Sequence, residues 1–222
     1  MTDRSHRSIH SQWGRTIAHL LGGVPLILLG WQLVQGRLGF NPVESVLRWT
    51  GRLALGLLLL SLSVTPIRKI FKISAISAMR KPLGLYAALY AFIHFSVFAL
   101  WDYQLNIRQI YLEISNKPFI LLGMIALLIL LVLAATSFRF WQRKLGRKWV
   151  WLHRSVYAAA LLVILHYLLA VKGDLFSLQG AYTAPLIAAG ILLLLLILRI
   201  PAIQQCLRPT FTQQEPDQPA SD

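Results

Sequence analysis

Charged residues are scarce in this chain of 222 residues, and cysteine is almost absent. Charged side chains make up 14% of the chain, whereas about 25% is usual in soluble domains. The mean hydropathy is +0.60, so a lipid bilayer rather than water is the expected surrounding of most of the chain. The single cysteine, Cys206, excludes an internal disulfide and is expected to be an ordinary residue of a terminal tail.

Motifs that mark nucleotide binding or hydrolysis are missing as well. The chain has no G-x-G-x-x-G, P-loop, H-E-x-x-H or G-x-S-x-G pattern. No pair of carboxylates falls within an apolar run, so neither hydrolysis nor ion pumping is supported. The net charge of +14 lies in short connections, without zinc-finger spacing or a basic stripe interleaved with aromatic residues. Nucleic acid is therefore not an expected partner.

The chain does contain a series of long apolar runs, and a helix needs about 20 mainly apolar residues to cross a bilayer. Six spans are expected, at about 16–35, 47–66, 82–101, 118–138, 149–171 and 181–200. Pro25 should bend the first span, Pro66 should end the second and Pro118 should open the fourth, because proline lacks an amide hydrogen. The expected fold is an all-α integral membrane protein, a six-helix bundle in which no internal repeat is evident.

Lysines and arginines are distributed unevenly among the connections. They gather before the first span, between the second and third, and between the fourth and fifth, whereas the other connections are nearly neutral. By the positive-inside rule, both termini are expected in the cytoplasm. Residues 1–15 are expected to form a basic leader without a cleavage site, 16–200 the membrane domain, and 201–222 a polar, disordered tail.

Four histidines lie within the expected spans or at their edges, where an ionisable residue suggests a function. They are His19, His94, His153 and His166. His94 on the third span and His166 on the fifth should lie at about the same depth, near the outer end. Two neutral imidazoles at one depth suit the two axial positions of haem iron. The plainer interpretation, that each histidine only ties helices together by hydrogen bonds, stays open.

His153 precedes His166 by thirteen residues, which is about 20 Å along a helix and some 140° around it. Either the helix is distorted, or His153 serves a different group, namely a second haem, a flavin or quinone site, or simply the membrane interface. His19 has no partner at matching depth and is expected to be structural. Any haem should be non-covalent, b-type haem, because the chain has no C-x-x-C-H motif.

Arginines at the ends of the spans are candidates to bind the acidic groups of such cofactors. Arg52 is expected near the level of His94 and His166, where it can pair with haem propionates or instead reach the lipid headgroups. Three more, Arg68, Arg80 and Arg154, lie at the basic edge. Positive-inside placement explains most of them, and one or two could bind a flavin phosphate.

Three stretches of the chain together resemble one known family. They are TGRLALGLLLLSLSVTPIRK, RKPLGLYAALYAFIHFSVFAL and RKLGRKWVWLHRSVYAAALLVILHYLLAVK, and the similarity covers about residues 10–200. The family is MsrQ (YedZ), of the ferric reductase-like transmembrane superfamily. The resemblance implies a bacterial inner-membrane subunit with haem b, in which FMN is also reported. It further implies electron transfer from quinols or a cytosolic flavin reductase to MsrP, a periplasmic molybdopterin enzyme that reduces methionine sulfoxide in oxidised proteins.

The resemblance also implies roles for particular residues. The haem-linked histidines of the family match His94, His153 and His166, and a basic residue of the family matches Arg80. Ferric reductases and NADPH oxidases carry two histidines on each of the third and fifth spans, for an inner and an outer haem. Here Arg80 stands where the third span would carry its inner ligand. An outer haem held by His94 and His166 is therefore implied, with a flavin or quinone site near His153, Arg80 and Arg68, as in STEAP-like reductases.

No part of the chain is suited to bind NAD(P)H, so electrons should come from a separate donor and leave to a separate acceptor. The leading hypothesis is an electron-transfer subunit that delivers electrons to a periplasmic partner. Two alternatives stay open. One is a self-contained, quinol-linked ferric or cupric reductase, and the other is a non-redox membrane carrier or assembly factor whose histidines only tie helices together.

Overall fold

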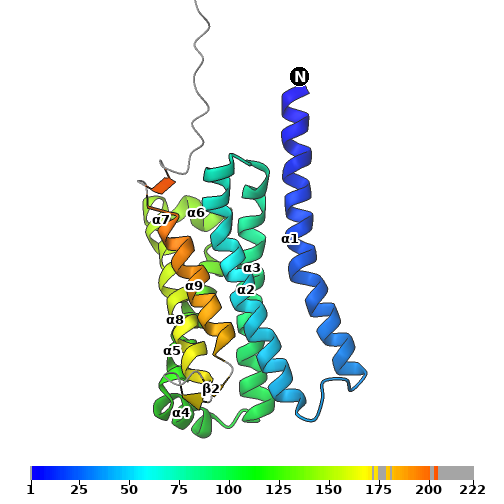
Figure 1. Ribbon diagram of the computed structural model, residues 1–222, viewed down its shortest axis with the longest axis vertical. Helices are drawn as coiled ribbons and strands as arrows, with labels where there is room; N and C mark the ends of the chain where they lie inside the picture. The colour runs from blue at the N-terminus through cyan, green and yellow to red at the C-terminus, as the bar shows by residue number, and fades with distance from the viewer. Residues whose placement is uncertain (1, 172, 175–178, 181, 201–202, 205–222) are drawn as a thin grey trace, which may run out of the picture.

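Long apolar helices lie side by side through most of the molecule (Figure 1). The computed structural model describes residues 2–171, 173–174, 179–180, 182–200 and 203–204. Among these residues, five helical stretches are long and apolar enough to cross a membrane: Gln12–Val34, Pro42–Phe71, Ala75–Asp102, Pro118–Ala135 and Arg147–Ala170. They correspond to the first five expected spans and confirm an all-helical membrane bundle.

The sixth expected span, 181–200, corresponds to α9 (Thr183–Ile197), an apolar helix of 15 residues. At about 1.5 Å per residue such a helix is about 22 Å long, shorter than the roughly 30 Å hydrocarbon core of a bilayer. The sixth helix is therefore present but short. The expected tail, 201–222, lies outside the described residues apart from 203–204.

The first half of the chain forms three long helices. Its elements are α1 (Thr2–Val34), α2 (Pro42–Phe71), the 3₁₀ helix η1 (Ala75–Met79), α3 (Arg80–Val97) and the π-helical turn η2 (Phe98–Asp102). α1 begins at Thr2, so the expected leader continues directly into the first span. The side chain of Asn41 accepts a hydrogen bond from the backbone N–H of Glu44, which caps the start of α2 beside Pro42.

α2 does not end at Pro66, as expected from the sequence, but continues to Phe71. A proline inside a helix leaves the carbonyl four residues earlier without its usual amide donor. That carbonyl belongs to Leu62, and it accepts a hydrogen bond from Nη2 of Arg199 at 2.7 Å. The expectation was wrong because a side chain from beyond α9 supplies the missing donor. α2 ends instead at Lys72, which adopts the left-handed conformation with φ 56°.

The second half of the chain contains shorter helices. Its elements are α4 (Ile107–Asn116), α5 (Pro118–Ala135), α6 (Arg139–Leu145), α7 (Arg147–Arg154), α8 (Val156–Ala170), the two-residue strands β1 (Gly173–Asp174) and β2 (Gln179–Gly180), and α9. The fifth span is interrupted at Ser155, whose N–H bonds to the carbonyl of Leu152 in a tighter turn. His153 on α7 and His166 on α8 therefore belong to two helices, which removes the ideal phase relation assumed for one straight helix.

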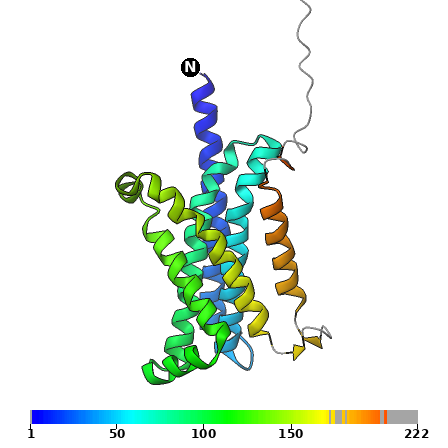
Figure 2. The same cartoon turned by 90° about the vertical axis from the view of Figure 1, so that its left-hand side faces the viewer.

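Two helix pairs form the core, α2 with α3 and α5 with α8, and α9 packs against α2 and α8 (Figures 1 and 2). Ala159 and Ala160 on α8 are fully buried, and their small side chains allow close approach of neighbouring helices. Tyr90 on α3 is also buried, and its hydroxyl donates to the carbonyl of Gly22, which ties α1 to α3. We call the end of the bundle that carries η1, α6 and α7 the basic end, and the end that carries α4 the opposite end (Figure 1).

Candidate functional site

His94 and His166 face one another in the half of the bundle near the opposite end. Their ring centroids are 6.2 Å apart and the ring planes are perpendicular. An imidazole nitrogen binds a first-row metal at about 2.0 Å and lies about 1.1 Å from the centre of its ring, so two imidazoles on opposite sides of one metal have centroids about 6.2 Å apart. The spacing of the two rings is therefore that of a bis-imidazole metal site.

Each of these histidines hydrogen-bonds through Nδ1 to a backbone carbonyl of a neighbouring helix. His94 Nδ1 donates to the carbonyl of Leu47 at 2.9 Å, and the Thr50 hydroxyl lies 3.3 Å from the same nitrogen. His166 Nδ1 donates to the carbonyl of Phe119 at 2.6 Å. A carbonyl can only accept, so both rings carry their proton on Nδ1 and keep the lone pair of Nε2 for a ligand. Histidines that bind metals are usually held in this way.

Both rings line one cavity of about 570 Å³, which we call the histidine cavity. Its volume is within the range of cofactor pockets. The walls are largely apolar and aromatic, and include Leu55, Phe95, Phe98, Met124 and Leu127. In the part of the chain that the structure describes, no group of three or more histidine, cysteine, aspartate or glutamate side chains could hold a bare metal ion. Two imidazoles beside a large apolar cavity instead suit iron that a porphyrin already holds.

Charged side chains line the histidine cavity toward α4. Glu44 pairs with Arg48 on one turn of α2, and Glu113 pairs with Lys117. The hydrogen bond to Glu113 raises the pKa of Lys117, which therefore stays protonated at neutral pH. Arg52, one turn beyond Arg48, also lines the cavity and has no carboxylate partner among the described residues. Arg52 is thus a cation available to an acidic group in this cavity.

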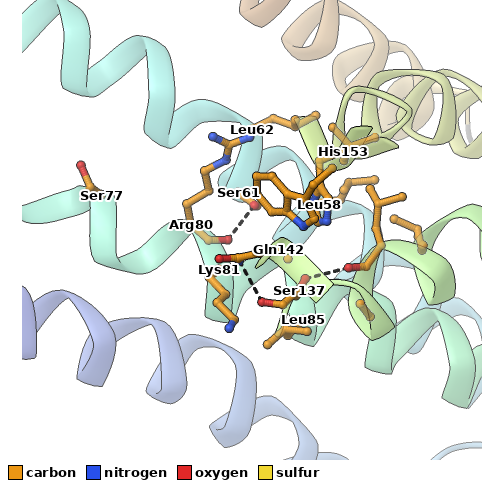
Figure 3. A pocket seen from close by; sticks show the side chains of 16 residues that line it. Leu58, Ser61, Leu62, Ser77, Arg80, Lys81, Leu85, Ser137, Gln142 and His153 are labelled. Atoms are coloured by element: carbon orange, nitrogen blue, oxygen red, sulfur yellow. Dashed lines mark hydrogen bonds between the residues drawn. The ribbon is translucent and has the colours of Figure 1, made fainter. Parts of the chain in front are cut away.

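A second cavity, of about 250 Å³, lies toward the basic end and is lined by His153, Arg80 and Lys81. We call it the basic cavity. In Figure 3 the side chain of Arg80 extends toward Leu62, whereas that of Lys81 extends the other way. Hydroxyl and amide groups complete the polar lining, from Ser61, Ser77, Ser137 and Gln142. Basic groups and neutral hydrogen-bonding groups are thus concentrated around one cavity.

The ring of His153 is fixed by two neighbours. It stacks on Trp149, with centroids 4.1 Å apart and planes 32° apart. Its Nε2 lies 3.3 Å from the hydroxyl of Thr136, which itself donates to the carbonyl of Val132. Because the single hydroxyl proton is used there, Nε2 of His153 must donate to Thr136. Nε2 is thus engaged, and Nδ1 remains as the acceptor, which suits hydrogen bonding to a ligand better than coordination of a second haem through Nε2.

Two of the expected basic residues do not line either cavity. Arg68 is exposed near the end of α2. Arg154 is exposed and lies over the ring of Trp151, with the guanidinium carbon 4.9 Å from the ring centre. Arg52 lines the histidine cavity and Arg80 lines the basic cavity, whereas Arg68 and Arg154 line neither. The cofactor-binding roles expected for all four stay predictions. His19 contacts Tyr86, with Nδ1 3.2 Å from the hydroxyl, as befits a structural role between α1 and α3.

Several site residues could not be singled out from the sequence. Trp149 precedes His153 by four residues, and this spacing places both side chains on one helix face. The spacing is the sequence signal that could have identified Trp149. Lys81 was hidden among other basic residues of a connection. Gly51 and Gly123 lie directly beside the rings of His94 and His166. Isolated glycines inside apolar helices were the signal for these two positions.

The two cavities lie end to end. Leu58 on α2 and Leu130 on α5 line both of them. The same pair of side chains therefore forms part of the wall of each cavity and lies between them. A group in the basic cavity and a group in the histidine cavity would be separated mainly by this leucine pair.

A membrane bundle that brings two imidazoles to one large apolar cavity has the architecture of a membrane haem protein. Consistent with this class, residues 50–165 match the family described as Ferric reductase like transmembrane component. The chain is also 37% identical, over 194 residues, to the protein-methionine-sulfoxide reductase heme-binding subunit MsrQ of Salmonella arizonae, a similarity that covers 87% of this chain and 94% of that relative. The chain belongs to the MsrQ family of ferric reductase-like transmembrane proteins.

Proposed function

We propose that the chain is the haem-binding, electron-transferring membrane subunit of a methionine sulfoxide reductase system. The observation that carries the proposal is the pair His94 and His166, 6.2 Å apart and with both Nδ1 atoms bonded to backbone carbonyls. Their Nε2 atoms would hold haem b, which supplies one-electron redox chemistry when bound. The name of the Salmonella relative, a heme-binding subunit, supports the same assignment.

Ligation by two histidines favours a relay of electrons over catalysis at the metal. His94 and His166 would hold the haem from opposite sides, and the haem would supply one-electron transfer without binding a substrate at its iron. The walls of the histidine cavity are mainly apolar, and Arg52 would pair with the propionates. The residues of this cavity would therefore hold and surround a redox group.

The basic cavity is the proposed place where electrons enter. Arg80 and Lys81 offer positive charge for a flavin phosphate, and Nδ1 of His153 can accept a hydrogen bond from a flavin N–H or a quinol hydroxyl. FMN and a quinol are thus the ligands that we propose for it. The ultimate donor would be the quinone pool or a cytosolic flavin reductase. Arg68 and Arg154 have no part in this proposal, because neither lines the cavity.

The orientation follows from the positive-inside rule, which would place the basic end at the cytoplasmic face of a bacterial inner membrane. The histidine cavity would then lie near the periplasmic face. Its proposed electron acceptor is MsrP, the periplasmic molybdopterin enzyme that reduces methionine sulfoxide in oxidised proteins. Electrons would cross from one cavity to the other past Leu58 and Leu130, which line both.

Spectroscopy of membranes that contain the chain tests this function. A short-chain quinol should produce a reduced b-type spectrum, and that spectrum should reoxidise only when both MsrP and methionine sulfoxide are added. His94→Ala should abolish the spectrum, whereas His19→Ala is the control expected to keep it. Reoxidation by Fe(III) citrate without MsrP would favour the self-contained ferric reductase. A colourless protein from haem-replete cells would overturn the redox proposal in favour of a carrier or assembly factor.

A further inference from the structure

The surroundings of His94 and His166 repeat one local arrangement. His94 bonds to the carbonyl of Leu47, and its ring lies against Gly51, four residues further along α2. His166 bonds to the carbonyl of Phe119, and its ring lies against Gly123, four residues further along α5. Each histidine also follows its carbonyl partner by the same distance in the chain, 47 residues.

The glycines are needed for space. A β-carbon at Gly123 would lie 2.7 Å from Nδ1 and 2.9 Å from Cε1 of His166, closer than atoms can pack. A β-carbon at Gly51 would lie 3.2 Å from Nδ1 and Cε1 of His94, which is a tight contact. Gly56 on the same helix has no such neighbour within 4 Å. Gly22 also lies close to a ring, that of Tyr86, but within α2 and α5 only Gly51 and Gly123 lie against the ring of a proposed haem ligand.

The spacing of four residues has a physical reason. In an α-helix the carbonyl of one residue points toward the amide of the residue four positions later, and the two side chains share a face. A side chain at the later position would cover the route by which a second donor reaches that carbonyl. Glycine leaves the route open, and the second lone pair of the oxygen can then accept an imidazole N–H.

We propose that Gly51 and Gly123 are positioning residues that form two matched cradles for the haem ligands. This inference rests on the proposed ligation by His94 and His166. Each cradle fixes its ring in the Nδ1–H tautomer and, through the hydrogen bond, makes Nε2 a stronger electron donor to iron. A stronger donor stabilises the oxidised metal, so the two cradles together lower the reduction potential of the haem.

The test is the midpoint potential of the full-length, haem-loaded protein in Gly51→Ala, Gly123→Ala and the matched control Gly56→Ala. Displacing a ring weakens its hydrogen bond, so the potential should rise. We expect Gly123→Ala to raise the midpoint potential by about 59 mV. For a one-electron couple, this is a tenfold rise in the ratio of reduced to oxidised haem at a fixed solution potential. Gly51→Ala should change it less, because its contact is milder, and Gly56→Ala should leave it unchanged.

Electron paramagnetic resonance should follow the same order, with altered low-spin signals in Gly123→Ala, smaller changes in Gly51→Ala and none in Gly56→Ala. Equal potentials and spectra in all three variants would overturn the cradle proposal while leaving haem ligation intact. A glycine that only lets helices pack would change stability without moving the potential.

A second measurement keeps the proposal testable if a variant loses its haem or does not fold. NMR of ¹⁵N-labelled histidine in the haem-free protein should report the Nδ1–H tautomer for both rings, and Gly51→Ala should weaken that signature for His94 alone. Haem-free wild-type protein from haem-replete cells would overturn the proposed function, and the NMR result would still decide whether the cradles exist. The opposite tautomer in the wild type would overturn the cradles.

Discussion

At the scale of single residues, the nitrogens of each histidine are assigned by the groups around them. His94 and His166 engage Nδ1 and keep Nε2, whereas His153 engages Nε2 at Thr136 and keeps Nδ1. The first pattern suits metal coordination, and the second suits hydrogen bonding to an organic ligand. The three histidines thus divide into a proposed metal pair and a proposed ligand-binding residue.

His153→Ala is accordingly expected to leave the b-type spectrum in place but to slow its reduction by quinol at least tenfold, because the donor loses the hydrogen bond that Nδ1 of His153 would accept. Stopped-flow reduction of the detergent-solubilised protein would measure this rate. His19→Ala, which removes a histidine that lines neither cavity, serves as the control. An unchanged rate in His153→Ala would refute an electron-entry site in the basic cavity.

Arg52→Leu is expected to speed the transfer of haem to apomyoglobin by a factor of about 1.4 to 5, since exposed ion pairs are worth about 0.2–1 kcal/mol. Arg37→Leu is the matched control, because Arg37 is exposed and does not line the histidine cavity. Equal rates for the two variants would place Arg52 among the headgroups rather than beside the propionates.

Which residues could be identified from sequence depended on the kind of signal that each one carries. His94, His166 and His153 stand out because an ionisable group in an apolar run demands an explanation. Gly51 and Gly123 carry no charge, and their significance appears only when another helix packs against them. The equal separation of 47 residues in the two histidine–carbonyl pairs was equally hidden, since the flanking sequences show no repeat.

At the scale of elements, the positions of the first five helices followed directly from the apolar runs, because lipid requires each run to satisfy its own backbone. Interruptions were harder to predict. Pro66 ought to stop α2, but Arg199 compensates from a distance of 137 residues in the chain. No proline or glycine in the sequence marks the break at Ser155. Local sequence signals fail at such points because a tertiary contact or a subtle turn decides the outcome.

The contact between Arg199 and Leu62 allows a double-mutant test. Arg199→Leu should lower the free energy of unfolding by about 1–3 kcal/mol, because the carbonyl of Leu62 is then buried without a donor. In a Pro66→Ala background the loss should be much smaller, because the alanine amide restores the helical hydrogen bond. Unfolding of the purified protein in mixed detergent micelles measures both effects.

Arg154→Leu is the matched control for this cycle. Both arginines lie over an aromatic ring, Arg199 over Tyr157 and Arg154 over Trp151, but only Arg199 donates to Leu62. Arg154→Leu should therefore change stability by less than about 0.5 kcal/mol. If Arg199→Leu were equally damaging with and without Pro66, its contribution would come from the ring contact alone.

At the scale of the whole molecule, the two cavities and the charge distribution define a direction. The basic cavity lies at the basic end, the histidine cavity lies toward α4, and Leu58 and Leu130 stand between them. We expect electrons to travel along this line from the cytoplasmic to the periplasmic face. The prediction depends on the orientation of the bundle in the membrane.

The single cysteine makes that orientation easy to test, although Cys206 lies outside the described residues. A membrane-impermeant maleimide should leave Cys206 unlabelled in cells with a permeabilised outer membrane, and should label it once the inner membrane is opened. A Gln104→Cys, Cys206→Ser double variant should label immediately, because Gln104 is exposed in the turn before α4. The reverse pattern of labelling would invert the proposed direction.

Quantitative haem content per polypeptide shows whether His94 and His166 together hold one haem b. We expect one haem per chain in the wild type and in His153→Ala, with none retained in His94→Ala or in His166→Ala. Full haem content in either of the last two variants would contradict the ligand assignment. Two haems in the wild type with one lost in His153→Ala would contradict the division of the molecule into one haem site and one site for an organic electron donor.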